Sequence, residues 1–138
     1  PKVLVDKIAV IGVRDLDPGE RRNITESGIH TFTMNEVDRR GFSSVMEEAL
    51  AIATNGTQAL HVSFDMDVVD PLLAPGVGTP VRGGLSYREA HLAMELIAES
   101  KRLTSLEVVE ANPILDVKNS TAELGVELIL SALGKRIM

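Results

Sequence analysis

The sequence predicts an α/β protein with a parallel sheet, because short apolar segments alternate with amphipathic segments along the chain. Strand-like segments at 8–13, 58–64 and 103–110 are each followed by a loop and a helix-like segment. This alternation implies right-handed βαβ crossovers and therefore parallel strands. Three strands make a narrow sheet for elements this apolar. We therefore expect about three strand-helix units of a larger, three-layer α/β/α sheet.

The first unit starts with residues 8–13, which are apolar and β-branched, as is typical of a strand buried on both faces. Residues 14–35 are rich in Asp, Gly, Pro and Glu and are expected to form a loop. A helix is predicted over 44–54, where Ser44 and Glu47 have the spacing of a capping box.

The second unit starts with residues 58–64, passes through a Gly/Pro-rich loop and continues as a helix from Ser86. Ser86 and Glu89 repeat the capping-box spacing. The helix is predicted to be amphipathic, with one apolar stripe formed by Leu92, Ala93, Leu96 and Ile97.

The third unit combines a strand over 103–110 with a final helix, which Ser120 and Glu123 are predicted to cap and Gly134 to end. Apolar residues surround most of this helix, so more than one neighbour should cover it. They are Leu124, Val126, Leu128, Ile129, Leu130 and Leu133.

The composition excludes several classes of function. The chain has 138 residues, a net charge of −6, no cysteine and 44% hydrophobic residues, which together fit a folded domain without thiolate chemistry. An acidic chain without a basic block argues against nucleic-acid partners and anionic membranes. No apolar run approaches the roughly 20 residues that span a bilayer. We expect a cytoplasmic protein.

Acidic residues follow all three predicted strands. Because the carboxyl ends of parallel strands meet at one edge of a sheet, these side chains should gather there. Clustered like charges repel each other unless protons or cations neutralise them, so the pattern favours a metal or a cationic substrate. Isolated acidic residues more often make turns and helix caps. The residues are Asp15, Asp17, Glu20, Asp65, Asp67, Asp70, Glu107 and Glu110.

Asp65 and Asp67 form the sharpest pair in this cluster. At positions i and i+2 of an extended backbone, both carboxylates would project to the same side, as two ligands of one metal should. Phe64, Met66 and Val68 would alternate to the other side and pack.

The remaining candidates are weaker. His30, His61 and His91 are scattered, and each is expected to be a packed or surface residue. The glycines at 76–78 and 83–84 suggest a tight loop with close backbone approach, more than a phosphate site.

The segment Ser-Phe-Asp-Met-Asp-Val-Val-Asp-Pro at 63–71 closely resembles the signature of the ureohydrolases, the family of arginase, agmatinase and related guanidino hydrolases. Residues 14–20, 78–85 and 107–113 resemble arginase segments, with Ala111 a mild departure. Agmatinase-like members tend to have an acidic residue where Val81 stands.

The resemblance covers residues 1–138 in register, but it extends only over the C-terminal half of a bacterial-type arginase. We therefore expect these residues to be the C-terminal part of one arginase-like domain whose N-terminal part is absent, which fits a chain opening on Pro1.

The resemblance implies hydrolysis of L-arginine to L-ornithine and urea by a hydroxide that two Mn²⁺ ions activate in each intact active site. It makes Asp65 a ligand that bridges both ions and takes part in catalysis, and Asp67 a ligand of one ion. Glu110 would be catalytic by positioning the guanidinium group. The substrate-binding residues it implies are Asp17, Glu20, Thr79 and Glu110, with Asp17 and Glu20 recognising the α-amino group.

The family's other metal ligands lie on motifs that resemble Gly-Gly-Asp-His and Asp-Ala-His-x-Asp, and neither occurs here. We therefore expect this polypeptide alone to be inactive, and the intact enzyme to be a homotrimer or homohexamer. One alternative is an agmatinase or another guanidino hydrolase. Another is a non-enzymatic module that binds cations or mediates assembly.

Overall fold

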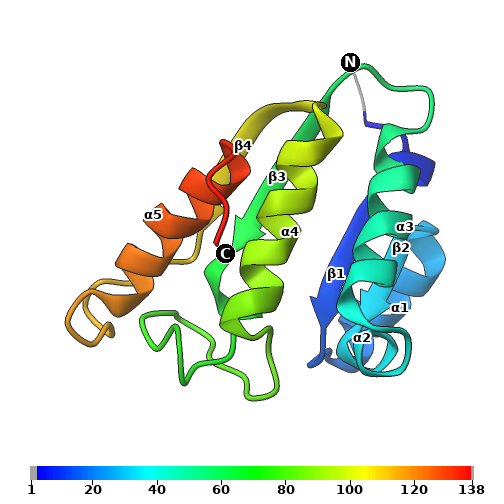
Figure 1. The fold of residues 1–138 in the computed structure, drawn as a ribbon. Helices are drawn as coiled ribbons and strands as arrows, with labels where there is room; N and C mark the ends of the chain where they lie inside the picture. The colour runs from blue at the N-terminus through cyan, green and yellow to red at the C-terminus, as the bar shows by residue number, and fades with distance from the viewer. Residues whose placement is uncertain (1–2, 138) are drawn as a thin grey trace. The chain divides into compact units, whose positions relative to one another are not determined.

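The computed structural model describes residues 3–137, so the expectation drawn from Pro1 lies outside the described residues. The chain divides into two compact units, one ending at Gln58 and the other starting at Ala59. Each unit contains a two-stranded parallel sheet with helices beside it, which confirms the predicted α/β class (Figure 1). Within residues 3–137, no helix is long and apolar enough to cross a membrane.

The first unit is built around strands β1 and β2, which pair in parallel. Helices α2 and α3 contact β1, and the core includes Phe32 of β2, Val37 of α2 and Val45 of α3. The elements in chain order are η1 (Val5–Lys7), β1 (Ala9–Val13), α1 (Pro18–Ser27), β2 (His30–Thr33), α2 (Met34–Arg40) and α3 (Phe42–Thr54).

The prediction that residues 14–35 form a loop is wrong, because this stretch contains α1, β2 and the start of α2. Pro18 occupies the first turn of α1, where its missing N–H costs nothing. Asp17 and Glu20 form a capping box there. The signals for a helix start were therefore present among the turn-forming residues.

Helix α3 starts two residues earlier than predicted, and the proposed Ser44–Glu47 capping box is wrong. The N-cap is Gly41, which has a φ of 82° and no side chain to cap with. Gly41 also ends α2, so one glycine with positive φ separates two consecutive helices. Glu47 instead accepts a hydrogen bond from Ser43 Oγ at 3.2 Å.

The second unit is built around β3 and β4, which pair in parallel with Asp65 opposite Val109. Helices α4 and α5 pack against each other (Figure 1). The elements are β3 (Leu60–Asp65), η2 (Met66–Val68), α4 (Tyr87–Ser100), β4 (Leu103–Val109) and α5 (Ser120–Ala132). The core includes Met66, Val69, Met94, Ile97, Leu124 and Leu128.

The two predicted caps of this unit have opposite outcomes. Ser86 and Glu89 form the expected capping box at α4. The Ser120–Glu123 box is wrong, because Asn119 is the N-cap and makes no side-chain cap hydrogen bond. Asp116 takes that role by accepting hydrogen bonds from the N–H groups of Thr121 and Ala122.

The apolar helices are only partly covered. On α4, Ala93 and Ile97 are buried as predicted, whereas Leu92 and Leu96 are half-buried. Helix α5 has more than one neighbour, as predicted. It packs on α4, and a Cβ at Gly125 would lie 3.6 Å from Met66 Sδ and 3.7 Å from Val108 Cγ1.

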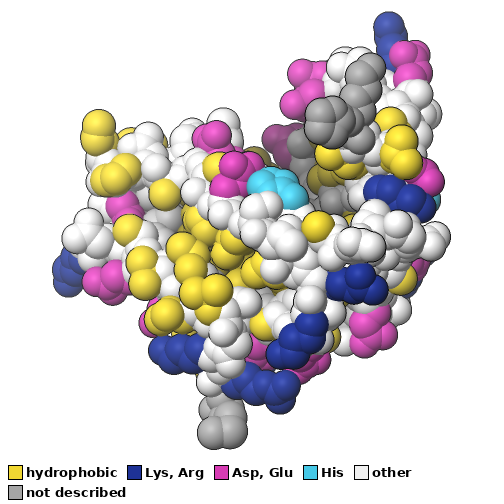
Figure 2. All heavy atoms as spheres, turned by 90° about the horizontal axis from the view of Figure 1, so that it is seen from above, with side chains coloured by type: hydrophobic (Ala, Val, Ile, Leu, Met, Phe, Trp, Pro, Cys, Tyr) yellow, Lys and Arg dark blue, Asp and Glu magenta, His cyan; other side chains and the backbone are white. Residues whose placement is uncertain are grey.

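The other side of α5 is exposed and carries Val126 and Leu130, beside Glu123 and Glu127, with Leu133 at the C-cap. The exposed fraction is 58% at Val126 and 73% at Leu133. Further exposed apolar side chains include Leu72 and Ile114. Hydrophobic side chains are also visible at the surface in Figure 2, between charged ones.

Candidate functional site

The carboxylate pair predicted from the sequence lies where β3 ends. Asp65 is the last residue of the strand, and Asp67 belongs to the short helix η2. The prediction that both residues are extended is therefore wrong. The two residues form a turn instead, in which the backbone N–H of Asp67 donates to Asp65 Oδ1 at 3.0 Å. Met66 between them is fully buried and fixes the turn to the core.

The environment of Asp65 disfavours its negative charge. Burial raises its pKa above the ordinary value, and the N–H of Asp67 acts in the opposite direction. The negative charges of Asp67 and Glu110 raise the pKa further. Asp67 and Glu110 thus both act on the charge of Asp65, and a bound cation would stabilise its ionised form.

Glu110 follows β4 directly and has a φ of 63°, an uncommon conformation for a residue with a side chain. The next residue, Ala111, forms an antiparallel bridge with Val77 in the loop after β3. The N–H of Asn112 donates to the carbonyl of Gly76 at 2.7 Å. The loops after β3 and β4 are therefore joined beside the carboxylates.

Thr79 lies in the loop after β3 and contacts the site directly. Its hydroxyl donates a hydrogen bond to Asp67 Oδ2 at 2.6 Å. Asp65, Asp67, Thr79 and Glu110 thus lie around the ends of β3 and β4. The contact between Thr79 and Asp67 was not anticipated, since the two residues are far apart in sequence.

Asp17 and Glu20 belong to the first unit and are exposed. Asp17 Oδ1 accepts hydrogen bonds from the N–H groups of Gly19 at 2.6 Å and Glu20 at 2.8 Å. Glu20 Oε2 accepts one from the N–H of Asp17 at 2.9 Å. Both carboxylates therefore cap α1.

The histidines lie as packed or surface residues, as expected. His30 is exposed on β2. His61 is exposed on β3, with Nδ1 2.8 Å from Ser105 Oγ and Nε2 3.7 Å from Glu107 Oε1. His91 is buried between α4 and α5, with Nδ1 2.9 Å from Ser131 Oγ. Glu107 thus faces a histidine.

The donors at the end of β3 fit a hard cation in type, although they are few. Carboxylate oxygens suit Mn²⁺, Mg²⁺ or Ca²⁺. Within residues 3–137, no three His, Cys, Asp or Glu side chains are grouped closely enough to hold a metal ion. Asp65 and Asp67 therefore suit a hard cation by donor type, but they are too few to form a complete metal site among these residues.

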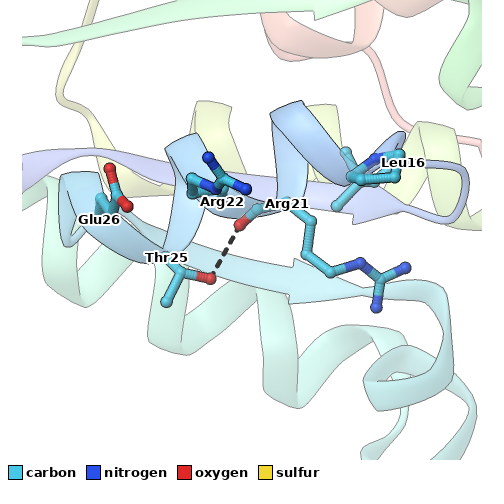
Figure 3. Close-up of a pocket in the computed structure, with 6 residues that line it drawn as sticks. Leu16, Arg21, Arg22, Thr25 and Glu26 are labelled. Atoms are coloured by element: carbon cyan, nitrogen blue, oxygen red, sulfur yellow. Dashed lines mark hydrogen bonds between the residues drawn. The ribbon is translucent and has the colours of Figure 1, made fainter.

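An open pocket in the first unit runs along α1 (Figure 3). Within it, the hydroxyl of Thr25 donates to the carbonyl of Arg21 at 2.8 Å. The lining contains two arginines and none of the residues predicted for the metal or substrate. It consists of Leu16, Pro18, Arg21, Arg22, Thr25 and Glu26.

Residues 1–134 match the model of a protein family described as the arginase family. The chain is 52% identical to an arginase from Bacillus caldovelox over 138 residues, which are 100% of this chain and 46% of that relative. The solved structure of that enzyme matches this chain with a TM-score of 0.93. The match covers 97% of this chain and 45% of the enzyme's chain.

A second solved structure, the arginase from Entamoeba histolytica in complex with L-ornithine, has a TM-score of 0.87. It is 32% identical, and the match covers 96% of this chain and 45% of that chain. This chain thus spans about half the length of the relatives it matches.

Proposed function

The chain belongs to the arginase family, and we propose that it is the carboxyl-terminal half of an arginase that hydrolyses L-arginine to L-ornithine and urea. The observation that carries the proposal is the pair of Asp65 and Asp67 where β3 ends, within a segment that resembles the family's signature. Glu110 follows β4 and is near enough to raise the pKa of Asp65. Similarity over the whole chain to an arginase supports the same activity.

Asp65 and Asp67 are proposed as manganese ligands, with Asp65 binding both ions and Asp67 one. When bound, two Mn²⁺ ions would make hydroxide available as the nucleophile near neutral pH. Burial and the negative charges of Asp67 and Glu110 raise the pKa of Asp65. A bound cation would offset these effects and stabilise the ionised carboxylate, which is the form that binds metal. Asp65 is also proposed to orient the nucleophile and later to help move its proton.

The carboxylates are proposed to select the substrate by charge. L-arginine carries a positive guanidinium group and a positive α-amino group. Glu110 would form a charge-assisted contact with the guanidinium group and hold its carbon in position. Asp17 and Glu20 would recognise the α-amino group, directly or through water. Thr79 would line the guanidinium end of the site.

The site is proposed to be completed by an N-terminal half that provides the other metal ligands, a proton-shuttling histidine and the donors for the substrate carboxylate. The completed protein would be a cytoplasmic homotrimer or homohexamer, as expected from the resemblance to bacterial arginases. A size measurement by light scattering tests the oligomeric state.

Activity is tested by completing the chain. The N-terminal half of the Bacillus caldovelox arginase, placed before residue 1, gives a protein that we call the completed enzyme. We expect the completed enzyme to release urea from L-arginine when Mn²⁺ is present, and the 138-residue chain to release none. A folded, manganese-loaded completed enzyme that leaves arginine intact would contradict the proposed activity.

The substrate is tested by comparing L-arginine with agmatine, which lacks the α-carboxylate. Faster turnover of agmatine would indicate the alternative guanidino hydrolase. Metal binding without turnover of any guanidino compound would indicate a cation-binding module.

A further inference from the structure

The loop that carries Thr79 is anchored on its N-terminal side. The N–H of Gly76 donates to the buried Thr121 Oγ1 at 2.8 Å, and its carbonyl accepts from Asn112. A Cβ at Gly76 would lie only 2.5 Å from the side chain of Asp116. Val77 is buried and bridged to Ala111. Two residues before Thr79, the backbone is therefore fixed to α5 and to the segment after β4.

The same loop is anchored on its C-terminal side. The N–H of Gly83 donates to Asp70 Oδ2 at 2.9 Å. Leu85 exchanges backbone hydrogen bonds with Val68 and Asp70, at 2.9 and 3.0 Å. A Cβ at Gly84 would lie 2.5 Å from the carbonyl oxygen of Val68, so the two backbones meet more closely than a side chain permits.

Between these anchors, the hydroxyl of Thr79 meets the carboxylate of Asp67. Thr79 is exposed and Asp67 is half-buried, so this hydrogen bond adds little to the stability of the fold. Its effect falls on the direction of the carboxylate. A metal-binding carboxylate with an outer hydrogen-bond donor is held in one orientation, and loss of such donors weakens metal binding.

We propose that Thr79, from its place at the guanidinium end of the site, is a positioning residue that orients Asp67 for the metal. This inference rests on the proposed manganese site and assigns the anchored loop a purpose. The anchors at Gly76 and at Gly83–Leu85 hold the hydroxyl in place before any metal arrives. The backbone of Asp67 is then held by its N–H bond to Asp65, and its carboxylate by the hydroxyl of Thr79.

The test replaces Thr79 with residues that separate hydroxyl from shape. Thr79→Val keeps the shape and removes the donor, Thr79→Ser keeps the donor, and Thr79→Ala removes the donor without added bulk. Thr25→Val is the matched control, because it removes an exposed threonine hydroxyl in α1 whose hydrogen bond goes to a carbonyl.

The first readout is Mn²⁺ affinity, measured on the 138-residue chain by paramagnetic broadening of the amide signals of Asp65 and Asp67, and on the completed enzyme by calorimetry. We expect Thr79→Val and Thr79→Ala to weaken Mn²⁺ binding about 10- to 100-fold, as for other outer hydrogen-bond partners of metal ligands. Thr79→Ser and Thr25→Val should bind as the unchanged protein does.

The second readout is kinetic. At saturating Mn²⁺, the KM of the completed enzyme for L-arginine should change less than about twofold in Thr79→Val. A raised KM with unchanged Mn²⁺ affinity would overturn the inference and make Thr79 a substrate contact. Absence of Mn²⁺ binding at Asp65 and Asp67 in the unchanged completed enzyme would instead overturn the proposed metal site, and the inference with it.

Discussion

The ends of β1 and β3 both carry acidic residues, and the side chains make different interactions at the two ends. After β1, Asp17 and Glu20 are exposed and accept hydrogen bonds from the backbone that starts α1. After β3, Asp65 and Asp67 are half-buried, and Asp65 interacts with the charges of Asp67 and Glu110. An acidic residue at a strand end is thus not a site in itself. Burial and the effect of nearby negative charges on the pKa of Asp65 distinguish the second group.

The largest expected effect is the loss of urea release on removing the charge of Asp65. In the completed enzyme, Asp65→Asn should lower the rate of urea release roughly 100-fold or more, because even outer partners of metal ligands cost 10- to 100-fold. Asp17→Asn is the matched change at the other strand end. Because asparagine also caps helices well, it should leave the free energy of unfolding nearly unchanged.

A difference in KM between these two variants sharpens the comparison. A raised KM for L-arginine in Asp17→Asn, without loss of Mn²⁺, would support its proposed contact with the α-amino group. Equal losses of Mn²⁺ in both variants would show that the distinction between the two strand ends is mistaken.

A second prediction concerns the close approach of backbones behind the metal ligands. Gly84→Ala should lower the free energy of unfolding by about 1–3 kcal/mol, as overpacking does, because the new Cβ would meet the backbone from Val68 to Asp70. Gly78→Ala is the control, since nothing lies within 4 Å of a Cβ there. Denaturant melts of the two variants check this, and equal stabilities would contradict it.

A third prediction uses a capping carboxylate of the second unit. Burial would raise the pKa of Asp116, but N–H groups of Thr121, Ala122 and Val117 donate to it and lower its pKa below the ordinary value of 3.8. Its ionised form therefore stabilises the fold above about pH 4, and this contribution is lost as the pH falls through the lower folded pKa.

The Asp116→Ala variant should lose about 1 kcal/mol of stability at neutral pH, the usual effect of removing a helix cap. Unfolding measured from pH 7 to pH 2 should show a smaller acid-induced loss in the variant than in the unchanged chain. Parallel pH profiles of the two proteins would rule out this role for Asp116.

The smallest predicted effect is at the N-terminus of α1. Asp17→Ala should lower the free energy of unfolding by about 0.5–1 kcal/mol, because α1 has no buried residue and its cap is solvent-exposed. Thermal melts check this value. The Mn²⁺ affinity of the chain should not change, and a loss of Mn²⁺ affinity would place Asp17 closer to the metal than we propose.

The sequence predicts some helix starts and misses others, for physical reasons. The spacing Ser86–Glu89 is a true capping box because Ser86 is the N-cap of α4. The same spacing at Ser44–Glu47 lies within a helix that starts at Phe42, where spacing alone carries no information. Before α5, Asp116 replaces the expected cap from outside the helix, by a turn that no local pattern indicates.

For the site, parallel topology predicts that carboxylates following different strands converge. This is met only in part: Glu110 after β4 is near enough to raise the pKa of Asp65, whereas Glu107 lies within β4 beside His61. Asp17 and Glu20 cap α1 in the other unit. The hydrogen bond from Thr79 to Asp67 could not be predicted in this way. It depends on a loop folded back on itself through Gly83 and Gly84, whose contacts join residues distant in sequence.

We propose that Asp65 and Asp67 provide two of the protein ligands of a binuclear manganese site. The most direct test is the Mn²⁺ content of the completed enzyme, measured by elemental analysis after equilibrium dialysis, with and without Asp67→Asn. We expect two bound Mn²⁺ ions in the unchanged protein and one in Asp67→Asn, with urea release falling in parallel. Two ions bound to Asp67→Asn, with unchanged urea release, would contradict it.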